Sequence, residues 1–418
     1  MSKKTNPNVA IVFDDLTEFF VMQDAINDMQ KSKIPVDIIV PYDSGYNGLA
    51  EHTIKKIKEL GYSPINDAPK NRVYQVLLTP YPQLDIVKRL SFIYHIRYPY
   101  GAATTKPNPV FLPSWKLDYD AILSFNTNEA KFLTAYGAEC FTLPYWNYYS
   151  FKKDPSKKPK KTLLILPTFG SSSSCVDGFT KSNIDSIKKH FHIIAKAHHA
   201  THFNPDEKQS FDKLKAIADE FYDSDTQVAS LFKKADLVLS DNSGAIFEAI
   251  CTETPVVLFT KTPNEKHLGP IDTLQYNLIQ NKIIPIASTP RDLLPVLLSA
   301  QSYAKKQISA KKELFLPVKK DSVHQFTILI DSYLNKTPDT DYRKYLHDLM
   351  LKERDSYIQQ INSLENSILR QQEENEKLKT IIDKQNQSIQ DIYNSTSWKI
   401  TRPLRNSIKF LKRKEKNE

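Results

Sequence analysis

Short apolar runs alternate with amphipathic segments through the first 150 residues of the chain. The runs that have the length of buried strands are residues 9–13, 36–40, 73–79, 90–94 and 121–124. Between them the apolar positions recur with a helical period, as in residues 16–29 and 49–60. Strands that alternate with helices predict an α/β domain on a doubly wound parallel sheet. We expect this N-terminal, Rossmann-like domain to cover residues 1–150.

The same alternation resumes after a polar, proline-broken and lysine-rich stretch at residues 151–161, which indicates a surface linker. The expected strands are residues 162–166, 191–195, 237–239, 256–259 and 283–286. The expected helices are residues 184–190, 206–221 and 228–233, and a segment that begins at Arg291. A second Rossmann-like domain is therefore expected over residues 162–335.

A seven-residue repeat replaces this pattern over residues 341–394, where the chain contains neither Pro nor Gly. Its a positions are Ile361, Ile368, Asn375, Ile382 and Ile389, and its d positions are Leu364, Gln371, Leu378, Gln385 and Ile392. A narrow apolar seam of this length predicts a coiled coil, dimeric and thus a homo-oligomer, in which Asn375 sets the register. A solitary amphipathic helix is the alternative.

The tail over residues 395–418 is basic. Residues 399–418 contain eight Lys or Arg and two Glu, which gives this segment a net charge of +6. The net charge of the whole chain is +9. The body is thus only weakly basic and needs no nucleic acid partner. Leu404, Ile408 and Leu411 share a helical face among cations, which is typical of a helix on an anionic membrane surface. The residues expected to contact the membrane are Trp398, Arg402, Arg405, Lys409, Lys412 and Arg413. A tail that only solubilises the coil is the alternative.

The composition, with 40% hydrophobic and 25% charged residues, is that of a globular protein. The three cysteines lie far apart without ligand spacing, which favours reduced thiols. The N-terminus has no apolar signal-peptide core, and the chain has no run of about 18 apolar residues. We expect a cytoplasmic protein attached peripherally to the inner face of the cell membrane.

The strand–turn–helix unit at residues 235–259 carries the clearest candidate chemistry. The residues that follow its first strand and supply turn and N-cap groups are Asp241, Asn242, Ser243 and Gly244. The free backbone N–H groups of such a turn suit a phosphate, and Glu248, about one helical turn on, could reach a ribose hydroxyl. Most turns of this kind only cap a helix, which is the alternative.

Two further groups follow strands. His95 comes after an apolar run, at the edge where open α/β sheets bind ligands, and a neutral imidazole there can take a proton from a hydroxyl. A histidine that satisfies a loop carbonyl is the alternative. Lys196 and His198 follow a strand of the second domain, where positive charge would stabilise a leaving phosphate. A zinc site with His198 and His202 is weaker, since no carboxylate or cysteine completes the ligand set.

As an ordered set, these residues resemble the CDP-glycerol glycerophosphotransferase family, which builds teichoic-acid-type polymers on a GT-B scaffold of two facing Rossmann-like domains. The resemblance covers roughly residues 90–300. The segments that carry it are Pro167-Thr168, Lys196-x-His198, Ala235-Asp236, Ser240 to Gly244 with Ile246-Phe247, and Pro255-Val256. The spacing of Ser243, Gly244 and Glu248 is also similar to that of non-hydrolysing UDP-sugar epimerases, whose glutamate holds ribose. The tail is similar to the SxSWxxTxPLR ending of bacterial surface-polysaccharide enzymes.

The resemblance implies a role for each matching residue. His95 would be the base on the acceptor hydroxyl, and His198 would assist the leaving group. Ser243 and Gly244 would contact the pyrophosphate. The full set of expected donor-binding residues is Thr168, Lys196, Asp241, Asn242, Ser243, Gly244 and Glu248. No cofactor and no metal is expected.

The function expected from this resemblance is the transfer of glycerol phosphate from CDP-glycerol to a membrane-linked glycan acceptor, in the synthesis of a bacterial cell-surface polymer. A GT-B glycosyltransferase that uses a nucleotide-diphosphate sugar is the first alternative. A non-catalytic scaffold of the same pathway is the second, and a sugar epimerase is weaker because it would not need the tail.

Overall fold

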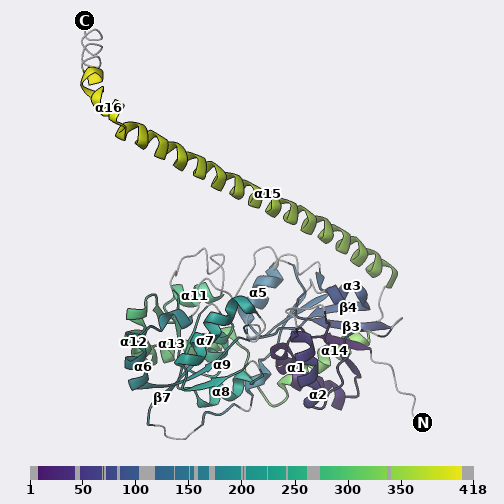
Figure 1. Cartoon of the computed structure of the whole chain (residues 1–418). Helices are drawn as coiled ribbons and strands as arrows, with labels where there is room; N and C mark the ends of the chain where they lie inside the picture. Colours follow the sequence, from purple (N-terminus) through teal and green to yellow (C-terminus); the bar gives the residue numbers. More distant parts are fainter. Residues whose placement is uncertain are drawn as a thin grey trace. The chain divides into compact units, whose positions relative to one another are not determined.

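The computed structural model describes two compact units, residues 1–345 and 346–418. The residues that it describes are 8–42, 48–67, 69, 72–81, 85–102, 118–135, 137–149, 151–154, 159–168, 175–198, 201, 204–223, 225–241, 243–260, 274–336 and 340–406. Both sheets lie in the first unit (Figure 1).

The first sheet is parallel, with strand order β2-β1-β3-β4-β5-β6. Its strands are β1 (Val9–Val12), β2 (Val36–Ile39), β3 (Val73–Thr79), β4 (Ser91–Arg97), β5 (Ala121–Ser124) and β6 (Cys140–Thr142). The helices among them are α1 (Leu16–Lys31), α2 (Leu49–Glu59), α3 (Asp85–Arg89), α5 (Thr127–Ala135) and the 3₁₀ turn η1 (Trp146–Tyr148). The residues of β1 and β5 are all fully buried, as expected where helices cover both faces of a sheet.

The second sheet is also parallel, with order β12-β11-β10-β7-β8-β9. Its strands are β7 (Lys161–Leu166), β8 (Phe191–Lys196), β9 (Glu220–Tyr222), β10 (Leu237–Ser240), β11 (Val256–Phe259) and β12 (Ile286–Ala287). The α-helices around it are α6 (Ile184–His190), α7 (Lys208–Ile217), α8 (Val228–Lys234), α9 (Ala245–Cys251), α11 (Leu274–Gln280), α12 (Pro290–Ser299) and α13 (Ala304–Leu314). The 3₁₀ turns are η2 (Cys175–Gly178), η4 (Pro205–Glu207) and η5 (Ala300–Tyr303).

Helix α14 (Ser322–Leu334) follows the second sheet in the chain but packs against α1 and β3 of the first, and Figure 1 draws it beside α1. Thr327 Oγ1 donates a hydrogen bond to Asp28 at 2.6 Å, and the Tyr333 hydroxyl donates to Glu139 at 3.1 Å. The chain thus crosses between its two sheets twice.

Three expected elements are wrong in extent. The helix expected over 206–221 ends at Ile217, because residues 220–222 pair with β8 as an edge strand. The spacing of apolar residues along the chain does not predict this pairing. The expected strand at 90–94 runs on to Arg97, because β3 continues to pair with it as far as Thr79. The last strand covers Ile286–Ala287 and therefore overlaps the expected strand, residues 283–286, only at Ile286.

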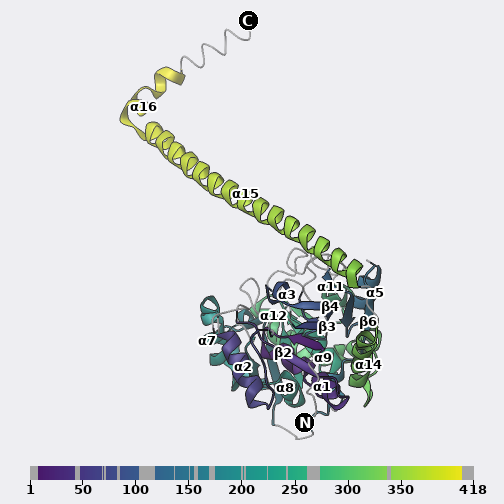
Figure 2. The same cartoon turned by 90° about the vertical axis from the view of Figure 1, so that its right-hand side faces the viewer.

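A single helix, α15 (Thr340–Asn394), covers the residues of the heptad pattern, and α16 (Thr396–Ile400) follows it (Figure 2). The expectation of a long helix is confirmed, while the coiled coil stays a prediction. Among the described residues, no helix combines the length and the apolar character that crossing a bilayer requires.

Candidate functional site

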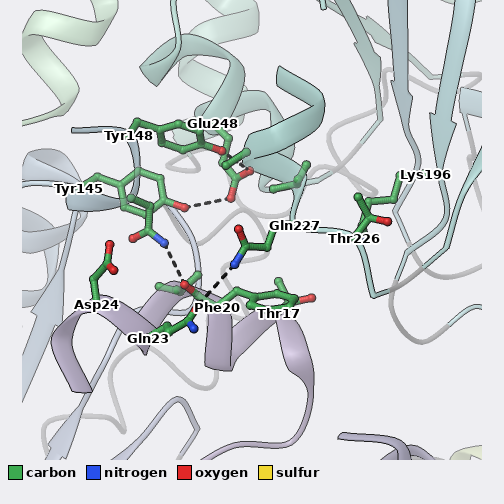
Figure 3. Close-up of a pocket in the computed structure, with 14 residues that line it drawn as sticks. Thr17, Phe20, Gln23, Asp24, Tyr145, Tyr148, Lys196, Thr226, Gln227 and Glu248 are labelled. Atoms are coloured by element: carbon green, nitrogen blue, oxygen red, sulfur yellow. Dashed lines mark hydrogen bonds between the residues drawn. The ribbon is translucent and has the colours of Figure 1, made fainter. Parts of the chain in front are cut away.

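A cavity of about 210 Å³ lies between α1 of the first sheet and the second sheet (Figure 3). Three parts of the chain line it: the α1 face, the η1 segment, and the loops and helices after β8, β9 and β10. The lining residues are Thr17, Phe20, Val21, Gln23, Asp24, Tyr145, Asn147, Tyr148, Lys196, Thr226, Gln227, Val228, Ala229 and Glu248. Two of the sequence-predicted donor residues, Lys196 and Glu248, are therefore brought together on one cavity.

Glu248 stands in the first turn of α9 and is held by two tyrosines (Figure 3). The Tyr145 hydroxyl donates to its Oε1 and the Tyr148 hydroxyl to its Oε2, each at 3.0 Å. Burial raises the pKa of Glu248, although both hydrogen bonds and the charge of Lys196 act the other way. Burial also raises the pKa of both tyrosines. The tyrosines therefore act as neutral donors at any moderate pH.

Lys196 is the last residue of β8, and it is 8% exposed. Burial lowers the pKa of its ammonium group, while the charges of Asp15 and Glu248 act to raise it. Its Nζ donates to the Ala197 carbonyl at 3.3 Å, a long and weak bond. A buried ammonium at a cavity wall binds an anion strongly, because the surroundings screen its charge little.

Asp241 supports the loops beside the cavity from within the core. Its carboxylate is fully buried and accepts the backbone N–H of Thr168 at 2.7 Å and of Cys175 at 2.8 Å. These bonds fix the ends of β7 and η2 against β10. Thr168 and Asp241 are thus brought together by the structure, and contact of either with a donor stays a prediction.

Ser243 and Gly244 come directly before α9, so they lie about one turn from Glu248, outside the set that lines the cavity. Ser243 Oγ accepts the Ala245 N–H at 3.3 Å, a local turn contact, while the N-cap of α9 is Gly244, which has no side chain to cap the helix. His198 lies two residues beyond β8, partly buried, and its carbonyl accepts the Thr201 N–H at 3.0 Å. Asn242 lies outside the described residues.

His95 lies within β4, not just past a strand as expected, because β3 pairs with β4 up to Thr79 and Arg97. It is 3% exposed, and both ring nitrogens have partners inside the domain. Nδ1 lies 2.8 Å from the Asp118 carbonyl, and Nε2 lies 2.8 Å from Thr79 Oγ1. A carbonyl only accepts, so Nδ1 carries a proton and donates to the Asp118 carbonyl. These contacts match the alternative of a structural histidine, and a role as base stays a prediction.

The residues at the start of the tail form a small hydrogen-bonded motif. The Arg405 guanidinium stacks 3.6 Å from the Trp398 ring centre, and its Nη2 donates to the Trp398 carbonyl at 2.5 Å. Ser395 Oγ caps α16 by accepting the Trp398 N–H. Ile400 and Leu404 are 70% and 67% exposed. Of the other expected contact residues, Arg402 is exposed, while Lys409, Lys412 and Arg413 lie outside the described residues.

Sequence reasoning missed the residues that α1 and η1 bring to the cavity. Tyr145 and Tyr148 carry no motif, and Phe20 and Asp24 belong to an ordinary amphipathic helix. The one available signal is the density of aromatic residues over 145–149, just before the linker. Among the described residues, no group of three His, Cys, Asp or Glu side chains is arranged to hold a metal ion.

The chain matches no protein-family model and no curated protein by sequence. Its fold is similar to solved structures. A UDP-GlcNAc 2-epimerase from Neisseria meningitidis bound to UDP-GlcNAc is 12% identical, with a TM-score of 0.51, and the match covers 78% of this chain and 100% of that one. The S. aureus MnaA–UDP complex is 12% identical, with a TM-score of 0.52 over 78% and 96%. The wall teichoic acid polymerase TagF soaked with CDPG is 14% identical, with a TM-score of 0.50 over 79% and 90%.

These similarities, together with the two parallel six-stranded sheets, define the class of the fold. It is GT-B, with two Rossmann-like domains that face each other. The sequence-based prediction of the fold is confirmed.

Proposed function

We propose that the chain is a GT-B transferase that binds a nucleotide-activated donor between its two domains, in the synthesis of a bacterial cell-surface polymer. The observation that supports this most is that Lys196 and Glu248 share one cavity with α1. A cation suits a diphosphate, and a carboxylate accepts the hydroxyls of a ribose. The volume of about 210 Å³ is below the roughly 300–1,000 Å³ of sites that enclose whole small molecules. We therefore assign this cavity to the ribose end of the donor.

In the favoured reaction the donor is CDP-glycerol and the acceptor is a membrane-linked glycan. The acceptor oxygen attacks the phosphorus that carries the glycerol, and the bond from this phosphorus to the bridging oxygen breaks. CMP leaves with the bridging oxygen, and Lys196 and His198 neutralise the charge that develops on it. The acceptor proton goes to a base, which the resemblance alone assigns to His95. The contacts of His95 with Thr79 and Asp118 favour a structural role, and a His95→Gln variant separates the two.

The rival reaction is glycosyl transfer from a nucleotide-diphosphate sugar on the same scaffold. The spacing of Ser243, Gly244 and Glu248 favours this rival, because it is similar to that of UDP-sugar epimerases. The two reactions break different bonds. Transfer from CDP-glycerol releases CMP, whereas glycosyl transfer usually releases a nucleoside diphosphate.

Each carboxylate oxygen of Glu248 accepts one tyrosine hydroxyl and keeps a second lone pair, so a ribose hydroxyl can hydrogen-bond to it beside the tyrosines. The Tyr145 and Tyr148 hydroxyls hold the carboxylate in one orientation for this contact. Glu248→Gln should therefore weaken nucleotide binding about tenfold or more, and replacing both tyrosines by Phe should weaken it less, because the carboxylate itself remains. A Glu248→Gln variant that binds nucleotide as tightly as wild type would contradict the assignment of this cavity to the ribose.

The test is calorimetric titration of the full chain with CDP-glycerol, CDP, UDP and UDP-GlcNAc, followed by identification of the nucleotide released with a glycan acceptor. Glu220→Gln is the matched control, since it removes a carboxylate from the same domain outside the cavity. Release of CMP supports the favoured donor, and release of UDP supports the rival. A wild-type chain that binds none of these nucleotides would refute the proposal and favour the scaffold.

We further propose that the tail contacts an anionic membrane surface, which would bring the enzyme to a lipid-linked acceptor. Ile400 and Leu404 expose apolar side chains beside the cations Arg402 and Arg405. The chain should sediment with phosphatidylglycerol vesicles more than with phosphatidylcholine vesicles, and Leu404→Ser should reduce this. Thr380→Ser, on α15, is the control. Equal sedimentation with both lipids would contradict the proposal.

A further inference from the structure

Helix α15, the long helix in Figure 2, carries an apolar stripe whose described side chains are exposed. The described apolar residues of the seam are 48–65% exposed: Leu364, Ile368, Leu378, Ile382, Ile389 and Ile392. They fall on the a and d positions of one heptad register, a stripe too narrow for the face of a globular core. A stripe of this kind packs against another helix with the same spacing.

We infer that this seam is covered by a second copy of the chain, aligned parallel and in register. Ile at a positions together with Leu at d positions favours two parallel strands. Asn375 occupies an a position, and in this alignment it meets Asn375 of the partner subunit, where the two amides hydrogen-bond within the seam. A shift of one heptad would bury Asn375 against Ile368 or Ile382, which costs an unsatisfied polar group.

The charges beside Asn375 distinguish the two possible directions. In a parallel pair a g residue faces the e residue five positions on in the other helix, so Glu374 faces Lys379 of the partner subunit. Lys379 is 70% exposed, and its only close carboxylate among the described ion pairs is Glu376 at 3.9 Å, a weak contact. In the antiparallel alignment that sets Asn375 against Gln371, Glu374 would face its own copy and repel it.

If the tail contacts a membrane as proposed above, the parallel alignment places two such contacts on one particle. It brings the Trp398–Arg405 motifs of both copies to the same end of the coil. Two weak membrane contacts on one particle bind far more tightly than one, because the second contact is then intramolecular. The mass of the particle in solution is independent of any lipid, so the dimer and the membrane contact can fail separately.

The first test is sedimentation velocity of the full-length protein across micromolar concentrations. We expect twice the 48.1 kDa mass of one chain. A variant with Ile368→Lys and Ile382→Lys should be monomeric, whereas Thr380→Lys on the opposite face should remain dimeric. Circular dichroism melting of the α/β body should be unchanged in both. A monomeric or trimeric wild type, or a seam variant that stays dimeric, would overturn the inference.

The second test addresses direction. Ile382→Cys should form an interchain disulfide under mild oxidation, and Thr380→Cys should not, with the native cysteines present in both. In the antiparallel alternative the two Cys side chains would lie about 27 Å apart along the helix axis. Glu374→Lys should weaken the dimer roughly three- to tenfold, and adding Lys379→Glu should restore it. A double variant whose dimer dissociates more readily than that of Glu374→Lys alone would contradict the parallel alignment.

Discussion

His95 and Lys196 both lie near the carboxyl ends of parallel strands, one in each sheet, yet their surroundings differ. His95 is enclosed by its own domain, with Thr79 and Asp118 on its two ring nitrogens. Lys196 ends its strand at a cavity that is also lined by the other domain. The strand position that marks ligand sites in α/β folds is therefore not enough by itself. A side chain there faces a cavity only where the second domain leaves space in front of it.

The largest expected effect comes from removing the positive charge of Lys196 at the cavity. Lys196→Met should lower the rate of nucleotide release by about 100- to 1,000-fold, because the charge that we propose stabilises the leaving group is lost. The fold should survive, since the ammonium group is costly to bury and Met fills similar space. The measurement is kcat alongside the thermal midpoint. A rate within about threefold of wild type would place the chemistry elsewhere.

The second prediction concerns the support beneath the cavity. Asp241→Ala should lower the free energy of unfolding by about 2–4 kcal/mol, because the N–H groups of Thr168 and Cys175 lose their buried acceptor. Asp241→Asn keeps one acceptor oxygen and should lose less. Urea unfolding measures both variants. A loss below about 0.5 kcal/mol for the Ala variant would mean that water replaces the carboxylate.

The third prediction tests the enclosed histidine. His95→Gln should lower the free energy of unfolding by about 1–3 kcal/mol, since two buried hydrogen bonds are disturbed. The rate per folded molecule should change little, and its pH profile should keep its shape. A fall of about 100- to 10,000-fold with an altered pH profile would instead identify a general base. That outcome would show that β4 rearranges when the acceptor binds.

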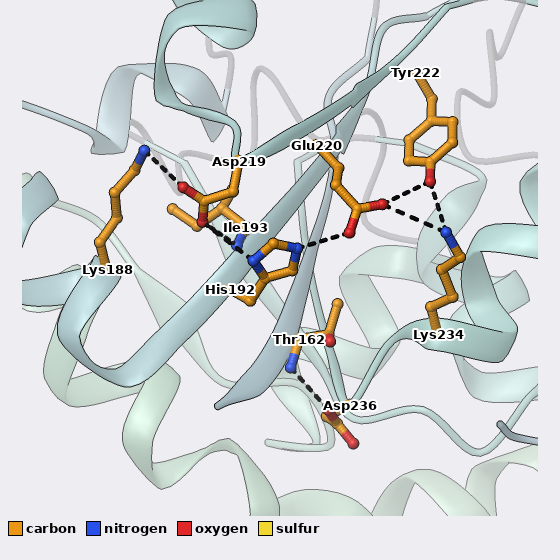
Figure 4. A network of polar contacts seen from close by, with 9 residues as sticks. All are labelled: Thr162, Lys188, His192, Ile193, Asp219, Glu220, Tyr222, Lys234 and Asp236. Carbon is orange, nitrogen blue, oxygen red and sulfur yellow. Dashed lines mark hydrogen bonds and ion pairs between the residues drawn. The ribbon is translucent and has the colours of Figure 1, made fainter. Parts of the chain in front are cut away.

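The smallest effect is expected from a change in the ion network around Glu220, which joins the beginning of β8 to β9 (Figure 4). Tyr222 and His192 hydrogen-bond the Glu220 carboxylate and lower its pKa to about 2. Because the folded pKa is depressed, its stabilisation is present above about pH 4.5 and is lost as the pH falls towards 2. Glu220→Gln should cost about 0.5 kcal/mol at pH 7, since the side chain is 41% exposed.

The pH dependence checks this last prediction. The difference in unfolding free energy between wild type and Glu220→Gln should shrink as the pH is lowered from 4.5 towards 2. A difference that grows with acid would mean that the carboxylate destabilises the fold.

Local patterns were sufficient for the parts of the fold that depend on burial. The strands at β1, β3, β5 and β11 begin and end within a residue of the expected positions, because buried apolar runs have few alternatives. Helix α15 was predictable for a different reason, since its heptad repeat is continuous over many turns. Strand β9 was not, because three edge residues gain their structure only by pairing with β8.

The sequence by itself determined the two α/β domains, the long helix, and the places of Lys196 at a strand end and of Glu248 early in a helix. These follow from periods of a few residues, which act within one segment of chain. Only the tertiary structure decided that Tyr145 and Tyr148 hold Glu248, that α1 closes the cavity, and that β4 extends through His95. The hydroxyl of Tyr145 meets a carboxylate 103 positions away, and no local pattern records a contact that packing alone creates.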